Sequence, residues 1–309
     1  MKILFVGFGS IAKKHLQALR EIRDDLEVYA LRSTKTSPPV DGVTSLYQVS
    51  EIPTGLAFAI ISNATSAHAG TLLIVSQLRC PIFIEKPVFH ELSKGNQVLA
   101  QQIKSVGIKT YVGCNLRFHP LMKAFKDLVF NNRSKVEEVN VYAGSYLPEW
   151  RPGVDYRNSY SAQRELGGGV DLDLIHEIDY ITWFFGFPYK AYALKNSHSS
   201  LNIDSPDAAY YILHYTNFVA TVTLNYFRKL PKRTFEVVLS DHIFELDLFN
   251  SKIYRDGQEI ISGHKNDMMT SYVHQMKYFI DGIESESSFE NDIENGLKVL
   301  EICLVDEIK

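Results

Sequence analysis

The chain has 309 residues, of which 45% are hydrophobic and 22% charged, and its formal net charge is −4. This length suffices for two domains with hydrophobic cores, and the composition is ordinary for a soluble globular protein. The charge gives no reason to expect a nucleic acid as partner, and no apolar run reaches the roughly 18 residues of a membrane helix.

The N-terminal segment and the cysteines point to a compartment. The apolar run within residues 1–10 is short, has no cleavage site and leads into a glycine turn, so we do not expect a signal peptide. Cys80, Cys114 and Cys303 are widely separated and lack metal-ligand spacing. We therefore expect a cytoplasmic protein without a metal site or disulfides.

The first third of the chain alternates between strand-like and helix-like segments. Short apolar strands are expected at residues 2–8, 27–32, 56–62, 81–87 and 108–115. Helices are expected between them at residues 10–22, 69–78 and 92–106. Strands that alternate with helices indicate βαβ units and a doubly wound parallel sheet covered on both faces.

From about residue 136 the pattern changes to consecutive strands joined by short turns. These strands are expected at residues 135–146, 190–196, 208–216, 218–227, 234–240 and 242–249. The segment 167–180 reads as a helix before the middle strands, and helices at 270–283 and 293–308 end the pattern. We predict an α/β protein with a parallel-sheet domain at 1–118 and, at 119–309, a domain with an open, mainly antiparallel sheet.

A nucleotide-binding turn is predicted directly after the first strand. The sequence "GFGSIA", Gly7 to Ala12, fits G-x-G-x-x-G/A and opens the first helix. Gly7 would make the tight turn, Gly9 would let the backbone approach a pyrophosphate, and the helix start would offer its N–H groups to phosphate. The candidate cofactor-binding residues of the turn are Gly7, Phe8, Gly9, Ser10 and Ile11.

The end of the second strand favours NADP(H), with NAD(H) as the alternative. An acid at this point binds a ribose hydroxyl, whereas an arginine accommodates a 2′-phosphate. Glu27 begins the strand and is at the wrong end, while Arg32 and Ser33 follow it. An ordinary basic loop would look the same.

Two further loops leave the carboxyl edge of the predicted parallel sheet. "ISNATSAH" contributes Asn63 and His68, and "EKP" contributes Glu85 and Lys86. A lysine buried at this edge can hydrogen-bond a substrate hydroxyl and the nicotinamide amide. A Glu-Lys pair taken alone is usually a surface ion pair.

The segment "GGGVDLDLIHEIDY" puts charged residues into a helix that otherwise reads as buried. Residues three and four apart share a helix face, so Asp173, His176, Glu177 and Tyr180 form one stripe, with Asp179 beside it. Asp171 lies near the helix start, and we expect it to stabilise that terminus of the helix rather than to belong to the stripe. The stripe is either a solvated face or one wall of a site.

An aromatic and basic segment precedes this helix. The stretch "YLPEWRPGVDYRNSYSAQRELGGG" supplies Trp150 and Tyr160, whose aromatic faces suit a polyhydroxylated ring. Arg117, in "NLRFHP", is a further candidate for binding substrate. For any one of these residues, a purely structural role is the competing interpretation.

Together these motifs resemble the Gfo/Idh/MocA family of glucose–fructose oxidoreductases and inositol dehydrogenases. "GFGSIAKKH", "ISNATSAH", "IEKP", "NLRFHP" and "GGGVDLDLIHEID" follow the family's order and spacing over essentially the whole chain. The resemblance implies an N-terminal Rossmann domain, a C-terminal α/β domain and oxidoreduction of a sugar or cyclitol hydroxyl. It also implies that Lys86 and His176 are active-site residues, with Asp173 close by.

The sequence departs from the family pattern at two positions. Many members place the aspartate four residues before the histidine, whereas Asp173 precedes His176 by three, a form associated with surface-sugar biosynthesis. Ala64 stands where many members carry proline. The first departure leaves open whether Asp173 orients the His176 imidazole or binds a sugar hydroxyl.

On this resemblance we expect an NAD(P)-dependent dehydrogenase or ketoreductase acting on a sugar, nucleotide sugar or cyclitol. His176 would be the general acid/base, and the charged stripe would face the nicotinamide. Glu177 and Asp179 would be supporting or structural residues. The competing classes are a glycosidase that uses bound NAD transiently and a non-catalytic nucleotide-sensing regulator, and retention of Lys86 and His176 argues against the regulator.

The strand-like segments at 218–227 and 234–240 predict self-association. They carry apolar or aromatic residues on both alternating faces, more than a one-sided sheet needs. The family resemblance also implies dimers or tetramers. We therefore expect a homodimer or homotetramer through the C-terminal sheet, and neither nucleic acid nor membrane as a partner.

Overall fold

The computed structural model describes residues 1–131 and 134–305, which divide into two compact units. The first unit comprises Met1–Asn115 and Tyr272–Leu300. The second comprises Leu116–Ser271 together with the chain from Glu301 onward. The division of the sequence into domains 1–118 and 119–309 stays a prediction. In the structure, the chain leaves the first unit and returns to it.

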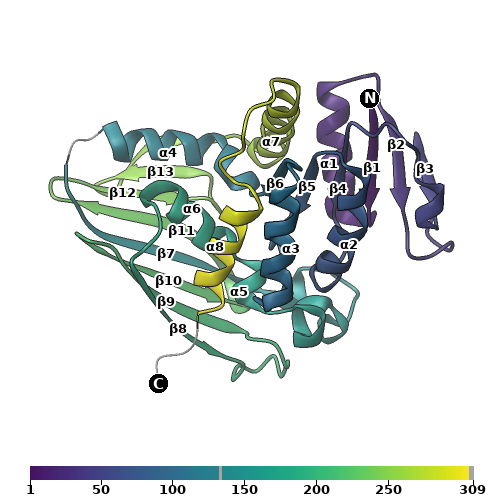
Figure 1. The fold of residues 1–309 in the computed structure, drawn as a ribbon. Helices are drawn as coiled ribbons and strands as arrows, with labels where there is room; N and C mark the ends of the chain where they lie inside the picture. Colours follow the sequence, from purple (N-terminus) through teal and green to yellow (C-terminus); the bar gives the residue numbers. More distant parts are fainter. Residues whose placement is uncertain (132–133, 306–309) are drawn as a thin grey trace. The chain divides into compact units, whose positions relative to one another are not determined.

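A six-stranded parallel sheet forms the centre of the first unit, in the order β3-β2-β1-β4-β5-β6 (Figure 1). The strands are β1 (Lys2–Val6), β2 (Glu27–Leu31), β3 (Val43–Leu46), β4 (Phe58–Ile61), β5 (Ile82–Glu85) and β6 (Thr110–Gly113). The helices between them are α1 (Ser10–Ile22), α2 (His68–Val75) and α3 (Lys94–Ser105). The strand order reverses at β1, which pairs with β2 on one side and β4 on the other. Ligands of such sheets bind beyond the carboxyl ends of the strands at this point.

The sheet of the first unit is buried on both faces. Every residue of β4, β5 and β6 is buried, as expected for central parallel strands. The returning part of the chain supplies α7 (Asp267–Glu284), whose Phe279 meets Phe58 and Phe83 edge-on at centroid distances of 5.1 and 5.4 Å. Residues near the C-terminal end therefore complete the core of the N-terminal sheet.

The second unit contains an eight-stranded sheet in the order β14-β13-β12-β11-β7-β10-β9-β8 (Figure 1). Its strands are β7 (Val136–Tyr146), β8 (Lys190–Asn196), β9 (Ala208–His214), β10 (Val219–Asn225), β11 (Phe227–Leu239), β12 (Ile243–Asp247), β13 (Lys252–Arg255) and β14 (Gln258–Ser262). β7 pairs in parallel with β10, and the other neighbours are antiparallel. The mainly antiparallel sheet is thus confirmed.

Helices of the second unit cover one face of this sheet. They are α4 (Pro120–Asn131), α5 (Val170–Asp173) and α6 (His176–Phe185). Phe125 of α4 and Tyr180 of α6 both pack on Phe235 of β11, at centroid distances of 5.1 and 5.0 Å. α5 contacts β9 and β10. This packing places the start of α6 against the helix-covered face of the sheet.

The predicted fold class is confirmed, with local differences. Strands β3, β13 and β14 were not expected from the sequence. The helix expected at 293–308 is α8 (Ile293–Cys303), and positions 306–308 lie outside the described residues. The single helix expected at 167–180 is instead α5 and α6, because Leu174 leaves the helical range at φ −101° and ψ 29°.

No helix in the described parts of the chain is both long and apolar enough to span a bilayer.

Candidate functional site

The glycine turn after β1 packs against the loop after β4. Gly7 has a φ of +82°, and a Cβ atom there would lie 2.7 Å from the backbone N and Cα of Asn63. The Gly7 N–H donates to the Leu31 carbonyl at 3.0 Å. Only glycine fits this position, because a side chain would be strained by the dihedral angle and would collide with Asn63.

Open space faces the next glycine and the start of α1. A Cβ atom built on Gly9 would meet no atom within 4 Å. No side chain caps the helix, so the backbone amides of its first turn, beginning with the exposed Ser10 and half-buried Ile11, are not covered by a capping group. A helix start of this kind attracts phosphate through its N–H groups and dipole. The turn therefore fits the pyrophosphate of a dinucleotide.

Arg32 and Ser33 follow β2 at the same edge of the sheet. Arg32 is buried, its Nη1 donates to the Pro38 carbonyl at 2.9 Å, and its guanidinium lies 5.4 Å from the ring centre of Phe8. Ser33 is exposed. Glu27, by contrast, is the first residue of β2, at the opposite end of the strand. One nitrogen of Arg32 is therefore hydrogen-bonded to the backbone, and its guanidinium lies over the Phe8 ring.

The loop after β4 is fixed by buried polar contacts. The Asn63 Nδ2 donates to Thr71 Oγ1 at 2.7 Å. His68 is buried, with Nδ1 3.2 Å from the Val88 carbonyl and Nε2 3.3 Å from the Asn63 carbonyl. Burial lowers the pKa of His68, although the adjacent carbonyls act in the opposite direction. In this structure His68 joins the Asn63 loop to the segment after β5, and its predicted role in cofactor binding stays a prediction.

Lys86 follows β5 directly and is half-buried. The preceding Glu85 is buried; one carboxylate oxygen contacts Nε2 of the fully buried His15, and the other accepts the Lys86 backbone N–H at 3.2 Å. His15 lies on α1, three residues after the glycine motif. The buried contact between His15 and Glu85 thus connects α1, which follows the glycine turn, to the residue before Lys86. His15 was not predicted from the sequence.

The acidic residues around His176 are buried in the structure. Asp171, Asp173, Glu177 and Asp179 are all at most 8% exposed, whereas His176, the first residue of α6, is half-buried. A solvated helix face would leave these carboxylates in water. The stripe is therefore an internal polar face of the second unit.

Three of these acids form ion pairs with cations from distant parts of the second unit. Asp179 accepts two hydrogen bonds from Arg117, at 2.9 Å from Nε and 2.7 Å from Nη2. Glu177 accepts from Arg233 Nε of β11 at 2.6 Å. Asp171 lies 3.0 Å from Lys195 of β8. Glu177 and Asp179 thus have structural partners, while substrate binding by Arg117 stays a prediction.

Asp173 accepts hydrogen bonds from two tyrosines. Tyr160 donates to one oxygen at 2.5 Å, and Tyr226 donates to the other at 2.6 Å. Tyr160 was a candidate from the sequence. Tyr226, fully buried between β10 and β11, was not, because a tyrosine in an apolar run such as "TLNYF" reads as a core residue.

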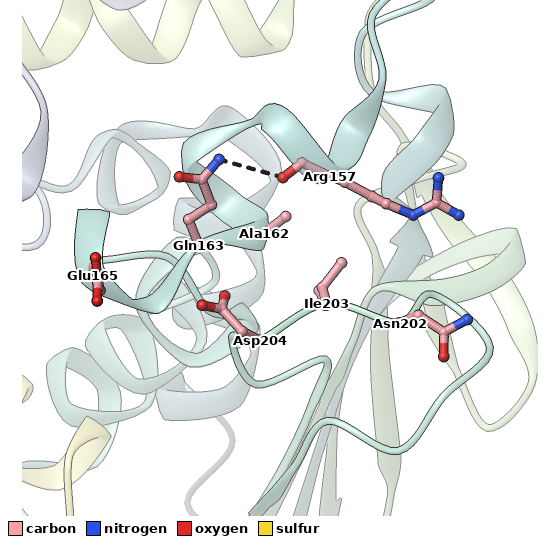
Figure 2. Close-up of a pocket in the computed structure, with 7 residues that line it drawn as sticks. All are labelled: Arg157, Ala162, Gln163, Glu165, Asn202, Ile203 and Asp204. Carbon is pink, nitrogen blue, oxygen red and sulfur yellow. Dashed lines mark hydrogen bonds between the residues drawn. The ribbon is translucent and has the colours of Figure 1, made fainter.

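Trp150 lies in the loop between β7 and α5 and is 38% exposed. Its Nε1 donates to Ser145 Oγ at 2.8 Å. The same loop borders a polar pocket of about 290 Å³ (Figure 2). The pocket is lined by Arg157, Ala162, Gln163, Glu165, Asn202, Ile203 and Asp204. Figure 2 shows Arg157 and Glu165 on opposite sides of the pocket. With Asp204, the lining therefore carries both charge signs.

Residues 134–245 match the family model of the GFO/IDH/MocA C-terminal domain. The matched residues lie within the second unit. The resemblance seen in the sequence motifs is thereby confirmed. The match covers most of the eight-stranded sheet and the entire α5–α6 segment. No curated protein matches this chain in sequence.

Solved dehydrogenase structures share the fold over nearly the entire chain. Levoglucosan dehydrogenase in complex with NADH has a TM-score of 0.82 and 14% identity, covering 98% of this chain and 95% of that one. WlbA from Bordetella pertussis, in complex with NADH and UDP-GlcNAcA, has a TM-score of 0.79 and 16% identity, with coverages of 97% and 93%. A myo-inositol dehydrogenase from Corynebacterium glutamicum has a TM-score of 0.77 and 17% identity, with coverages of 98% and 94%. At these identities, the likeness establishes a common fold.

Proposed function

We propose that this protein is an NAD(P)-dependent oxidoreductase that transfers a hydride between nicotinamide and a CH–OH carbon of a sugar, nucleotide sugar or cyclitol. The observation that carries the proposal is that Lys86 follows β5 at the same carboxyl edge of the parallel sheet as the turn at residues 7–11. A half-buried ammonium at this edge can donate hydrogen bonds to a substrate hydroxyl. The GFO/IDH/MocA C-terminal domain, and the NADH bound by other dehydrogenases of this fold, support it.

The proposed roles follow from the chemistry of alcohol oxidation. The carbon loses a hydride and its hydroxyl loses a proton, so one carbonyl forms and two electrons leave. A bound nicotinamide would supply the hydride acceptor. His176 takes the hydroxyl proton, since imidazole titrates near neutral pH, and Lys86 hydrogen-bonds a substrate hydroxyl. In the reductive direction His176 returns the proton to the oxygen.

We propose NADP(H) as the preferred cofactor, with NAD(H) as the alternative. Arg32 and Ser33 follow β2 where a ribose 2′-substituent is read in this fold. Within residues 1–131 and 134–305, Arg32 donates through Nη1 to the carbonyls of residues 37 and 38, so Nε and Nη2 can donate to a phosphate.

Substituting Gly9 tests the cofactor site without disturbing the fold. Because a Cβ at Gly9 would meet nothing, Gly9→Val should fold normally and should occupy the space proposed for the pyrophosphate. We expect NADPH binding, followed by its fluorescence, to be lost in Gly9→Val. Gly70→Val is the matched control, since a Cβ at Gly70 in α2 also meets nothing. Equal NADPH affinity in Gly9→Val and the parent would contradict the proposed site.

The reaction is tested by screening free sugars and nucleotide sugars with NADPH and NADH, following nicotinamide absorbance. With an active substrate, His176→Ala should lower turnover by about 10²–10⁴-fold at unchanged cofactor affinity. His198→Ala, at an exposed position of the same unit, should leave turnover unchanged. Aglycone release without net cofactor oxidation would indicate the NAD-dependent glycosidase instead. Cofactor binding without turnover of any sugar would favour the regulator.

A further inference from the structure

The connection between β7 and α5 is long and consists of a series of short turns. Residues 147–169 contain only the short 3-10 turns η5 (Leu147–Glu149), η6 (Tyr156–Asn158), η7 (Tyr160–Ala162) and η8 (Arg164–Leu166). Loops longer than about 12–15 residues without helices or strands are uncommon and are usually either functional or disordered. Trp150, Tyr156 and Ser161 are among the residues around an internal gap of only about 10 Å³, so the loop packs on itself.

The start of this loop and its Tyr160 are both linked to the Asp173 carboxylate. In the second half of the loop, the Tyr160 hydroxyl donates to Asp173 Oδ1 at 2.5 Å. At the near end, Tyr226 accepts the Leu147 N–H on its carbonyl at 2.8 Å and donates its hydroxyl to Asp173 Oδ2 at 2.6 Å. These hydroxyl–carboxylate distances are those of strong, charge-assisted hydrogen bonds.

The Tyr226 ring also contacts Trp150, the most exposed aromatic residue of the loop. Trp150 meets Tyr226 edge-on, with ring centroids 5.3 Å apart and planes at 89°. Tyr226 is completely buried, so its position is fixed by the sheet, and Trp150 is positioned against a rigid surface. Tyr226 therefore contacts the loop start through its backbone carbonyl, and Trp150 and Asp173 through its side chain.

A close backbone approach fastens the other end of the loop. A Cβ at Gly168 would lie 2.1 Å from the Tyr160 carbonyl oxygen and 2.7 Å from that of Ser161. Only a residue without a side chain permits this packing. The segment carrying Tyr160 is thus pressed directly against the start of α5.

We propose that Tyr160, Asp173 and Tyr226 form a clamp that positions the 147–169 loop for substrate, and that Tyr226 is a positioning residue of the reaction. The role in the reaction rests on the proposed function; the clamp itself does not. Burial, reinforced by the Asp173 charge, raises the pKa of both tyrosines above the ordinary value. Both hydroxyls therefore remain protonated donors at neutral pH. Asp173 acts here as an acceptor that holds the loop.

Hydrogen–deuterium exchange of the loop peptides tests the clamp directly. Tyr226→Phe keeps the ring and removes the hydroxyl, so we expect amides of residues 147–166 to exchange about ten- to a hundred-fold faster. Tyr160→Phe, at a half-buried position, should do the same from the other end. Tyr211→Phe is the matched control, because this buried tyrosine of β9 donates to the Cys303 carbonyl at 2.9 Å. Unchanged loop exchange in both Tyr226→Phe and Tyr160→Phe would overturn the clamp.

A double variant separates the clamp from a general loss of stability. Asp173→Asn should speed loop exchange by itself, and adding Tyr226→Phe to it should produce little further change, because both act through one carboxylate. Fully additive effects would show that Tyr226 stabilises the sheet independently of Asp173.

Kinetics then test the positioning role. With the best sugar found, Tyr226→Phe should raise KM for the sugar about ten-fold at unchanged NADPH affinity, and Tyr211→Phe should not. An unchanged KM alongside faster loop exchange would retain the clamp and contradict the positioning role. A parent protein that binds nicotinamide but oxidises or reduces no sugar would contradict the proposed function, while exchange would still decide the clamp.

Discussion

The carboxylates of residues 171–179 are buried among leucine and isoleucine side chains, and each has a partner of its own. Lys195, Arg233 and Arg117 pair with Asp171, Glu177 and Asp179, and two tyrosines donate to Asp173. A buried charge without a partner would cost several kcal/mol. The partners explain how a helix segment can carry this many acids without facing solvent.

At the same scale, Arg32 decides the cofactor prediction. Arg32→Ala should weaken NADPH binding by about 1.5–3 kcal/mol, the value of a hydrogen bond to a charged group, and should leave NADH binding nearly unchanged. Fluorescence titration with both cofactors measures the difference. NADH also serves as the internal control, because Arg32 bonds the carbonyls of residues 37 and 38 and its loss can loosen that loop. Equal losses for both cofactors would show that Arg32 does not read the 2′-phosphate.

At the scale of elements, the Arg117–Asp179 pair joins the turn η4 (Asn115–Phe118) to α6. Both side chains are at most 6% exposed, so removing one partner leaves a buried charge. Arg117→Met should lower the free energy of unfolding by about 3–5 kcal/mol, measured in urea. Lys277→Met breaks an i,i+4 pair in which both side chains are more than half exposed and should change it little. A small effect of Arg117→Met would indicate that solvent reaches Asp179.

Most helices and strands could be predicted from the sequence, but the partners of the buried acids could not. Alternating apolar patterns predicted most of the strands and helices, whereas β3, β13 and β14 escaped because they are short and partly polar. The i,i+3 stripe assumed one continuous helix, whereas the helix breaks at Leu174, between Asp173 and His176. That these two side chains face one site stays a prediction. The partners were not predictable: Arg117 and Arg233 lie 62 and 56 residues from Asp179 and Glu177, and no local pattern selects one arginine.

At the scale of the molecule, the uncovered face of the eight-stranded sheet is predicted to associate with another copy. Leu194 and Tyr210 are paired across β8 and β9, and both are exposed, as is Ile212 nearby. Light scattering at micromolar concentration should give a dimer or tetramer, and Ile212→Glu should dissociate it by placing a charge on this face. Val106→Glu, at an exposed apolar position of the first unit, is the control. A monomeric parent protein would contradict the prediction.

Acid should destabilise the molecule through its buried histidines. The pKa of His68 is lowered mainly by burial, so below about pH 6.5 the unfolded chain binds a proton that the folded chain does not. The free energy of unfolding should therefore fall as pH drops below this value, by at most about 1.4 kcal/mol per pH unit for one histidine. His68→Gln should flatten the dependence, measured by urea unfolding from pH 7 to pH 5. The exposed His198→Gln should leave the slope as it is, and an equally steep slope in His68→Gln would refute the assignment.

The return of the chain to the first unit has a consequence for synthesis. Domains generally fold as units, N-terminal first, while the ribosome is still translating. Here the N-terminal sheet lacks Phe279, which packs on Phe58 and Phe83, until α7 has been made. The second unit likewise lacks Cys303, whose carbonyl accepts from Lys195 at 2.7 Å and from Tyr211 at 2.9 Å. Helix α8 contributes to the first unit through Leu300 and to the second from Glu301. A nascent chain therefore completes neither unit before α8 emerges, and a stop codon ahead of α8 would leave both unfinished at once.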